Sequence, residues 1–200
     1  EDVFAMDRFL WFLALENLFL DADGYLSKAG DYLLYLDPLS GRIHPVQHDG
    51  NETLITNGLG GISTSPTYGD TLSARPFTLK VFAIPHYRQR YLAHLRTLLA
   101  ESFHLGYFEP RILAHATLVE AQVAADTGKQ TSTAAFAASV YGASGTLRQF
   151  VANRRTSLLG NSQVNPPHPQ ILALETPTLQ GVATAARPVA IRAILSTNVP

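Results

Sequence analysis

The sequence predicts an α+β fold that is mainly α, with one small β-hairpin near the N-terminus and a possible β-rich tail. Stretches with helical spacing of apolar residues recur along most of the chain. A single pair of strand-like runs flanks a turn, at residues 32–47. The 200 residues are 46% hydrophobic and 16% charged, which is typical of a globular domain with a substantial core.

The first predicted element is a helix from about Val3 to Leu20, with Asp2 as its N-cap. Apolar residues cover most of its circumference, which indicates a central helix that is packed on several sides. The only polar interruption between Phe9 and Leu20 is Glu16-Asn17.

A β-hairpin follows, with strands at Tyr32–Leu36 and Arg42–Gln47. The turn between them, Asp37–Gly41, contains the proline and glycine that such turns favour. A long Gly-, Ser- and Thr-rich loop is predicted from Asn51 to Pro76.

Further helices are predicted at residues 86–103, 110–126, 132–141 and 146–159, and strands at 170–174 and 188–195. The proline-rich break near Asn165 suggests two parts, which we place at residues 1–162 and 163–200. Because the chain opens at Glu1 directly into a helical pattern, we expect a piece of a longer protein.

Composition argues against several classes of function. The net charge is −1 and Arg154-Arg155 is the only adjacent basic pair, so no nucleic-acid partner is expected. The absence of cysteine excludes disulfides and thiolate metal sites. No apolar run is long enough for a membrane span, and no signal peptide is visible.

Candidate functional residues gather between the end of the first helix and the end of the hairpin: Asp21, Asp23, Asp31, Asp49, Asn51 and Glu52. The outer ends of a hairpin lie close together, so Asp31 should neighbour His48-Asp49. Crowded carboxylates repel one another unless a cation lies between them, and their oxygens suit Mg²⁺ or Ca²⁺ beside nucleotide phosphates.

Two alternatives stay open at this point. Aspartates at helix ends and turns often only cap the backbone, which is the interpretation we favour for Asp21 and Asp37. Alternatively, His44, His48 and Asp49 could bind Zn²⁺ or Fe²⁺ in a hydrolase. A serine-hydrolase elbow and a Walker phosphate loop are absent from the sequence.

Several ordered blocks resemble the spore coat protein H (CotH) kinase family over roughly residues 3–160. They are Met6–Leu18, Asp23–Tyr25, Asp31–Tyr35, Gly41–Thr53, Pro85–Leu92 and Phe150–Arg155. The resemblance implies the C-terminal lobe of an atypical protein-kinase-like fold. It also implies a secreted or cell-surface enzyme that phosphorylates Ser or Thr of protein substrates with ATP and Mg²⁺ or Mn²⁺.

By this resemblance, Asp23 matches the catalytic-loop aspartate and Asp49 the metal-binding aspartate, with Asp31 and Asn51 as supporting cofactor-binding residues. The chain departs from the family pattern at His48, where an aromatic residue is usual, and at Asp31, where Asn is common. The lysine and glutamate that hold ATP are expected in an N-terminal lobe of the parent chain, without which we expect little activity. The alternative is a catalytically silent structural or binding module of a spore coat or cell-surface assembly.

Overall fold

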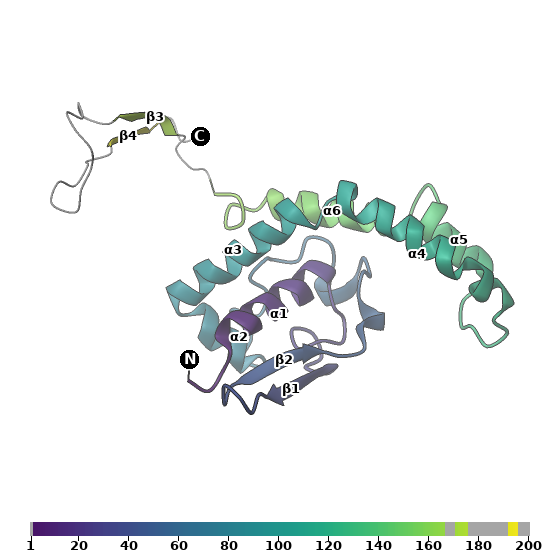
Figure 1. Cartoon of the computed structure of the whole chain (residues 1–200), viewed down its shortest axis with the longest axis horizontal. Helices are drawn as coiled ribbons and strands as arrows, with labels where there is room; N and C mark the ends of the chain where they lie inside the picture. The colour runs from purple at the N-terminus through teal and green to yellow at the C-terminus, as the bar shows by residue number, and fades with distance from the viewer. Residues whose placement is uncertain (1, 167–170, 176–191, 196–200) are drawn as a thin grey trace. The chain divides into compact units, whose positions relative to one another are not determined.

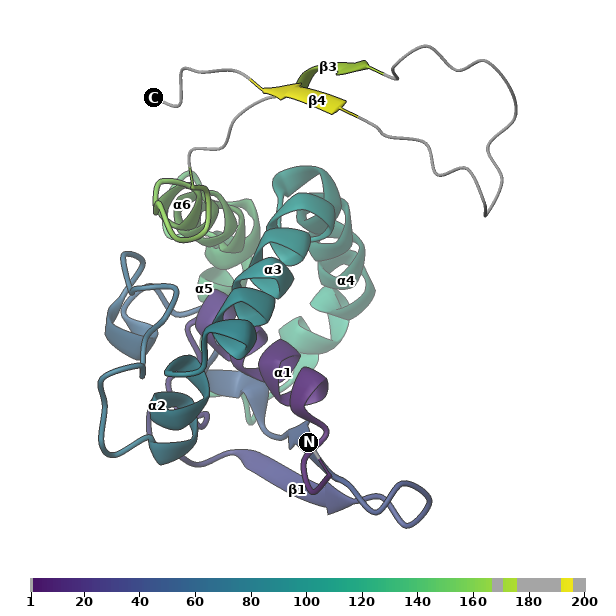
Figure 2. The same cartoon turned by 90° about the vertical axis from the view of Figure 1, so that its left-hand side faces the viewer.

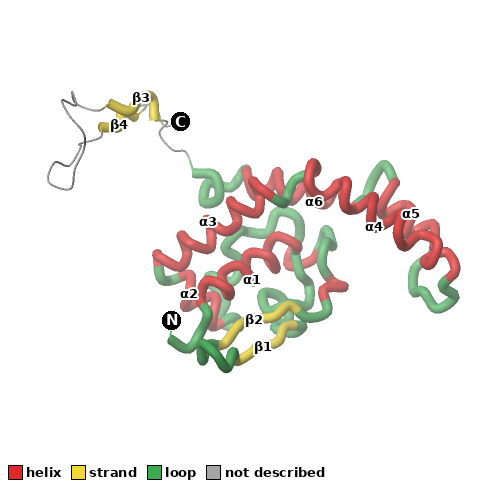
Figure 3. Tube along the Cα trace, viewed as in Figure 1, coloured by secondary structure: helices red, strands yellow, loops and turns green. Residues whose placement is uncertain are grey.

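The computed structural model describes residues 2–166, 171–175 and 192–195. The chain divides into two compact units, residues 1–165 and 166–200, and each is described by itself. Figures 1 and 2 show the chain from two sides, and Figure 3 marks its helices and strands.

The first unit is mainly helical with a small two-stranded antiparallel sheet, which confirms the α+β class. Its elements are α1 (Met6–Phe19), β1 (Tyr32–Leu36), β2 (Ile43–Gln47), the 3-10 turns η1 (Gly50–Glu52) and η2 (Gly58–Gly60), α2 (Pro76–Phe82), α3 (Pro85–Glu101), α4 (Leu105–Ala125), α5 (Thr133–Tyr141) and α6 (Leu147–Leu159). Within the described residues, no helix is both long and apolar enough to span a membrane.

Helix α1 is the centre of the first unit, as its all-round apolarity predicts. It lies between the hairpin and α3 in both Figures 1 and 2. Its core-facing residues include Leu10, Leu13 and Leu18, and they join Tyr91 and Leu95 of α3 in one hydrophobic cluster. Burial of these side chains is the main source of stability for such a lobe.

The predicted start of the first helix is wrong. Helix α1 begins at Met6, and its N-cap is Ala5 rather than Asp2. Residues before it instead pair with the hairpin, because Val3 O accepts from the Ile43 N–H at 2.8 Å and Ala5 N donates to Ile43 O at 3.0 Å. Pairing with a sheet edge satisfies the backbone there better than another helical turn would.

The hairpin is confirmed, with Tyr32 opposite Gln47 and Leu36 opposite Ile43. Asp37 forms its turn, as predicted: one carboxylate oxygen accepts from Leu39 N, and the other accepts from the backbone N–H and the hydroxyl of Ser40. These bonds lower the pKa of Asp37, chiefly through the Ser40 hydroxyl.

The predicted helices at 86–103, 132–141 and 146–159 correspond to α3, α5 and α6. The helix predicted from residue 110 begins earlier, at Leu105, so that Pro110 lies inside α4. Helix α2 was not predicted, and Thr78 and Val81 within it are β-branched residues that weaken a helical signal in seven residues.

The second unit contains one described sheet, in which β3 (Ile171–Glu175) pairs antiparallel with β4 (Arg192–Leu195). Strand β4 falls within the segment predicted at 188–195, and β3 overlaps the segment predicted at 170–174 and ends one residue beyond it, at Glu175. The remaining residues of those predictions, 170 and 188–191, lie outside the described part of the chain.

Candidate functional site

The loop that follows α1 is held by two buried carboxylates. Glu16 accepts hydrogen bonds from Tyr25 N at 2.8 Å and from Leu26 N at 2.9 Å. Asp21 accepts from Asp23 N at 3.1 Å and from Gly24 N at 2.9 Å. Four successive backbone N–H groups therefore point at two carboxylates, which fixes the path of residues 21–26.

Gly24 allows the loop backbone to pass close to the two carboxylates. A Cβ at this position would lie 2.6 Å from Glu16 Oε1 and 2.9 Å from the Asp21 carboxylate, well inside contact distance. No other residue fits without displacing the carboxylates. The prediction that Asp21 caps the backbone is confirmed, and the same bonds hold the backbone of Asp23 in place.

Burial raises the pKa of Glu16 to about 7, although its bonds from Leu26 and Tyr25 favour the charged form and oppose the shift. Glu16 is only 2% exposed and Asp21 only 1%. The negative charge of Asp21 nearby also raises the pKa of Glu16.

Asp23 projects from this fixed loop and is partly exposed. Its carboxylate forms an ion pair with Lys28, whose ammonium group also lies in the field of Glu52 and Asp31. The pKa of Lys28 is raised, first by its hydrogen bond to Asp23. The predicted acidic cluster thus has a lysine as its internal cation in this structure.

Backbone hydrogen bonds bring the other candidate residues to the same place. His48 N donates to Asp31 O at 3.3 Å, which confirms that the two ends of the hairpin are neighbours. Ala22 N donates to Glu52 O at 3.0 Å, so the segment with Asp49 and Asn51 runs beside the loop that carries Asp23.

Gln47 makes a further link, because its Nε2 donates to Asp21 Oδ2 at 2.9 Å. The last residue of β2 is thereby tied to the carboxylate that holds the Asp23 loop. Asp49 follows two residues later, exposed and in the left-handed region at φ 43°. Asn51 is exposed within η1, and Asp31 is also left-handed, at φ 47°.

A cavity of about 300 Å³ lies beside these residues. Phe12, Leu15 and Phe19 of α1 line it together with Leu54, and its polar members include Glu16, Asp21 and Gln47. The two buried carboxylates thus lie between the Asp23 loop and an apolar cavity.

Within the described residues, no three His, Asp or Glu side chains stand close enough together to hold a metal ion. The hypothesis of a Zn²⁺ or Fe²⁺ site at His44, His48 and Asp49 is therefore not supported by the structure. A kinase-type site needs fewer metal ligands from the protein, because one or two carboxylates share Mg²⁺ with the phosphates of the nucleotide. Carboxylate and amide oxygens of Asp49 and Asn51 are of the kind that Mg²⁺ prefers.

Sequence reasoning missed the parts played by Glu16 and Gln47. A signal was present for Glu16, since a glutamate within an apolar helix must be buried with partners or neutralised. Gln47 gave no signal, because its bond to Asp21 depends on the fold.

Comparison with known proteins adds one finding. A family model described as CotH kinase protein matches residues 1–158, about four-fifths of the chain. This span contains α1, the hairpin, Asp23, Asp31, Asp49 and Asn51. A search of curated proteins found no match.

Proposed function

The chain belongs to the CotH kinase protein family, and from this premise we propose that it forms the C-terminal lobe of a kinase that transfers the γ-phosphate of ATP to Ser or Thr of proteins. The observation that carries the proposal is the joining of two loops at one end of α1. Bonds from Ala22 to Glu52 and from Gln47 to Asp21 place the Asp23 loop beside the Asp49 segment. Phosphoryl transfer needs one carboxylate at the attacking hydroxyl and another at the metal.

In this proposal Asp23 orients the substrate hydroxyl and accepts its proton. A positioned base must hold its place, and the Asp23 backbone is held through Asp21. The Asp23 carboxylate forms an ion pair with the ammonium group of Lys28. Lys28 is 68% exposed, so this pair is weak and can open when a substrate arrives.

Asp49 would hold Mg²⁺ or Mn²⁺, with Asn51 and Asp31 as supporting oxygen ligands or contacts to the nucleotide. The metal supplies charge neutralisation at the phosphates of ATP. Asp49 is exposed, as a residue that must meet the nucleotide should be.

The proposal includes an N-terminal lobe of the same protein as a partner. A kinase needs a lysine for the α- and β-phosphates and a glutamate to hold that lysine. Lys28 is engaged with Asp23, Lys80 lies in the last turn of α2, and Lys129 donates to Asp126 O beyond α4. We propose that the lobe described here has little activity until that second lobe is present, and that the enzyme acts outside the cell or at its surface.

The test is phosphoryl transfer by the longest form of the protein that its gene encodes, with labelled ATP and Mg²⁺ or Mn²⁺. Asp23→Asn and Asp49→Asn should each lower the rate by about a hundredfold or more, because each removes a group that acts in the transfer. Asp126→Asn is the matched control, since Asp126 is exposed at the far end of α4. Activity that survives in both site variants would contradict these roles.

A second candidate function is a catalytically silent binding module of a spore coat or surface assembly. Exposure of β1 favours it, because Leu33, Leu34 and Leu36 are each more than half exposed. Such apolar surface often serves in protein–protein contact. This function predicts no transfer with either metal and no effect of ATP on the melting temperature of the full-length protein.

A further inference from the structure

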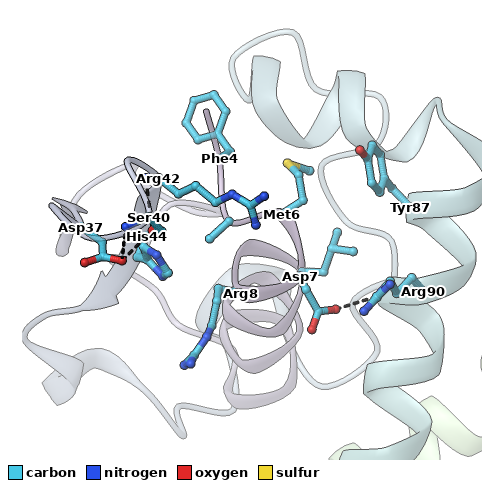
Figure 4. Close-up of a pocket in the computed structure, with 12 residues that line it drawn as sticks. Phe4, Met6, Asp7, Arg8, Asp37, Ser40, Arg42, His44, Tyr87 and Arg90 are labelled. Atoms are coloured by element: carbon cyan, nitrogen blue, oxygen red, sulfur yellow. Dashed lines mark hydrogen bonds and ion pairs between the residues drawn. The ribbon is translucent and has the colours of Figure 1, made fainter. Parts of the chain in front are cut away.

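A second cavity, of about 450 Å³, lies away from the carboxylates, at the opposite end of α1 and of the hairpin (Figure 4). The start of α1, the hairpin turn with the start of β2, and the first turns of α3 line it. In Figure 4, Tyr87 and Arg90 stand on the α3 side, opposite the residues of α1 and the hairpin.

Positive charge predominates in the lining. Three arginines, Arg8, Arg42 and Arg90, face two aspartates. Both aspartates already have partners: Asp7 accepts from Arg90 Nε at 2.6 Å and bonds His94 Nε2 at 2.7 Å, and Asp37 is satisfied within its turn.

The guanidinium groups of Arg8 and Arg42 have no hydrogen bond or ion pair to any other described residue, and both residues are exposed. In Figure 4, Arg42 extends from the hairpin towards Met6, and Arg8 extends from α1 near His44. His44 Nε2 is buried without a hydrogen-bond partner, which is uncommon for a buried ring nitrogen. The cavity therefore combines two free guanidinium groups with an unsatisfied imidazole.

The N-terminal ends of two helices add to the positive potential of the cavity. Both α1 and α3 begin at the cavity, and neither has a side-chain cap on its first turn. The N-terminal end of a helix carries partial positive charge and unpaired N–H groups. Two such ends beside two unpaired arginines favour an anionic ligand.

We propose that this cavity binds acidic peptide segments, with Arg8 and Arg42 as the principal anion-binding residues. The cations come from three separate elements, so they suit a ligand with several anionic groups better than a single ion. Phe4 and Met6 offer apolar contact beside them, which suits a peptide that mixes acidic and apolar side chains. The proposal does not depend on the kinase function, since the cavity and the Asp23 loop lie at opposite ends of α1.

The test is fluorescence anisotropy with a labelled peptide that alternates aspartate and leucine, without ATP or metal. We expect saturable binding that weakens as salt rises, and much weaker binding of the matched asparagine peptide. In the double variant Arg8→Gln/Arg42→Gln, affinity should fall by about tenfold or more, because two charge-assisted contacts are lost.

The control is Arg111→Gln/Lys129→Gln, which removes the same charge near the two ends of α4 and should change affinity by less than about twofold. The Arg8→Gln/Arg42→Gln variant should keep the melting temperature, since neither side chain makes a bond to another described residue. The control should change it little, because the described contacts of Arg111 and Lys129 are with nearby residues of α4 and its C-cap at the surface. Equal losses in both variants would overturn the proposal, as would equal binding of the asparagine peptide or no saturable binding. A phosphoserine peptide tells whether phosphate or carboxylate is preferred, and either preference at Arg8 and Arg42 supports the site.

Discussion

Glu16 is the residue whose ionisation the fold alters most usefully for an experiment. Its pKa is raised from 4.5 to about 7, so the folded chain holds this proton more tightly than the unfolded chain does. The stabilising contribution of Glu16 is therefore complete below pH 4.5 and is lost as the pH rises through about 7.

Between about pH 5 and about pH 8, the free energy of unfolding should fall by about 2 kcal/mol more in the wild type than in Glu16→Gln, which has no carboxyl group to titrate. Urea unfolding of both proteins at the two pH values measures this difference. Glu101→Gln, at the exposed end of α3, should behave like the wild type. Parallel pH profiles for wild type and Glu16→Gln would show that the pKa of Glu16 is not raised.

Arg154 is a buried cation that has no carboxylate partner among the described residues. Its guanidinium donates to Ile62 O and Thr64 O at 2.8 Å, and to the side-chain oxygen of Asn17 at 2.7 Å. Burial lowers its pKa to about 10, which leaves it charged at neutral pH. One side chain of α6 thus joins α1 to the loop after η2.

Arg154→Lys should lower the free energy of unfolding by about 3 kcal/mol, because an ammonium group cannot reach all these oxygens and leaves some of them buried without a donor. Thermal or urea unfolding measures the loss. Arg155→Lys is the control, because the side chain of Arg155 makes no hydrogen bond to another described residue. This variant should change the free energy of unfolding by less than about 0.5 kcal/mol. Equal effects at the two positions would mean that the contacts of Arg154 contribute nothing.

At the scale of single elements, α6 depends on its N-cap residue, Thr146. Thr146 is buried, and its hydroxyl accepts from Gln149 N at 3.2 Å. Gln149 in turn accepts from Gly145 N at 2.6 Å, which resembles a capping box. This start sets the position of α6 and so the direction in which Arg154 points.

Thr146→Ala should therefore destabilise the chain by about 1 kcal/mol, the usual cost of losing a cap. Thr146→Ser keeps the hydroxyl and should recover most of that loss. The measurement is the midpoint of urea unfolding. If Ser and Ala variants unfold at the same urea concentration, the hydroxyl is not the stabilising group.

Elements defined by local chemistry could be predicted from the sequence. The hairpin turn is one, because Asp37, Pro38 and Gly41 shape it without help from the rest of the chain. The start of α1 was predicted wrongly because Val3 and Ala5 pair with Ile43. The local sequence does not indicate a backbone partner so far along the chain.

In the candidate site, too, some features follow from the local sequence and others depend on contacts between distant residues. Its acidic residues stand out in the sequence, and the nearness of Asp31 to His48 follows from the hairpin. The contact between Arg154 and Asn17 spans 137 positions, and only the tertiary fold brings these two residues together. The roles of Asp23, Asp31, Asp49 and Asn51 remain predictions for the transfer assay.

At the scale of the whole molecule, the first unit ends at Asn165, after the last residue of its core. Val164 is 1% exposed and belongs to the main hydrophobic cluster. Arg96 of α3 donates to Val164 O at 2.7 Å and to Gln163 O at 3.1 Å. Residues 163–164 thus complete the lobe.

A chain that ends at residue 165 should unfold at the same temperature as the 200-residue chain, because it keeps this cluster whole. A chain that ends at residue 162 should lose about 2–3 kcal/mol through the missing valine and the unpaired Arg96. Calorimetry of the three lengths makes the comparison. Identical melting of the two shortened chains would show that Val164 is dispensable.

The loop of residues 21–26 has a consequence for protein engineering. Its course is set by main-chain groups that point at Glu16 and Asp21, and by the side chains of Tyr25 and Leu26, which pack in the core. The Asp23 side chain takes no part in that support. Position 23 can therefore be exchanged for other reactive side chains while the loop keeps its shape. The same arrangement allows the chemistry at this position to change during evolution without a change in the architecture that presents it.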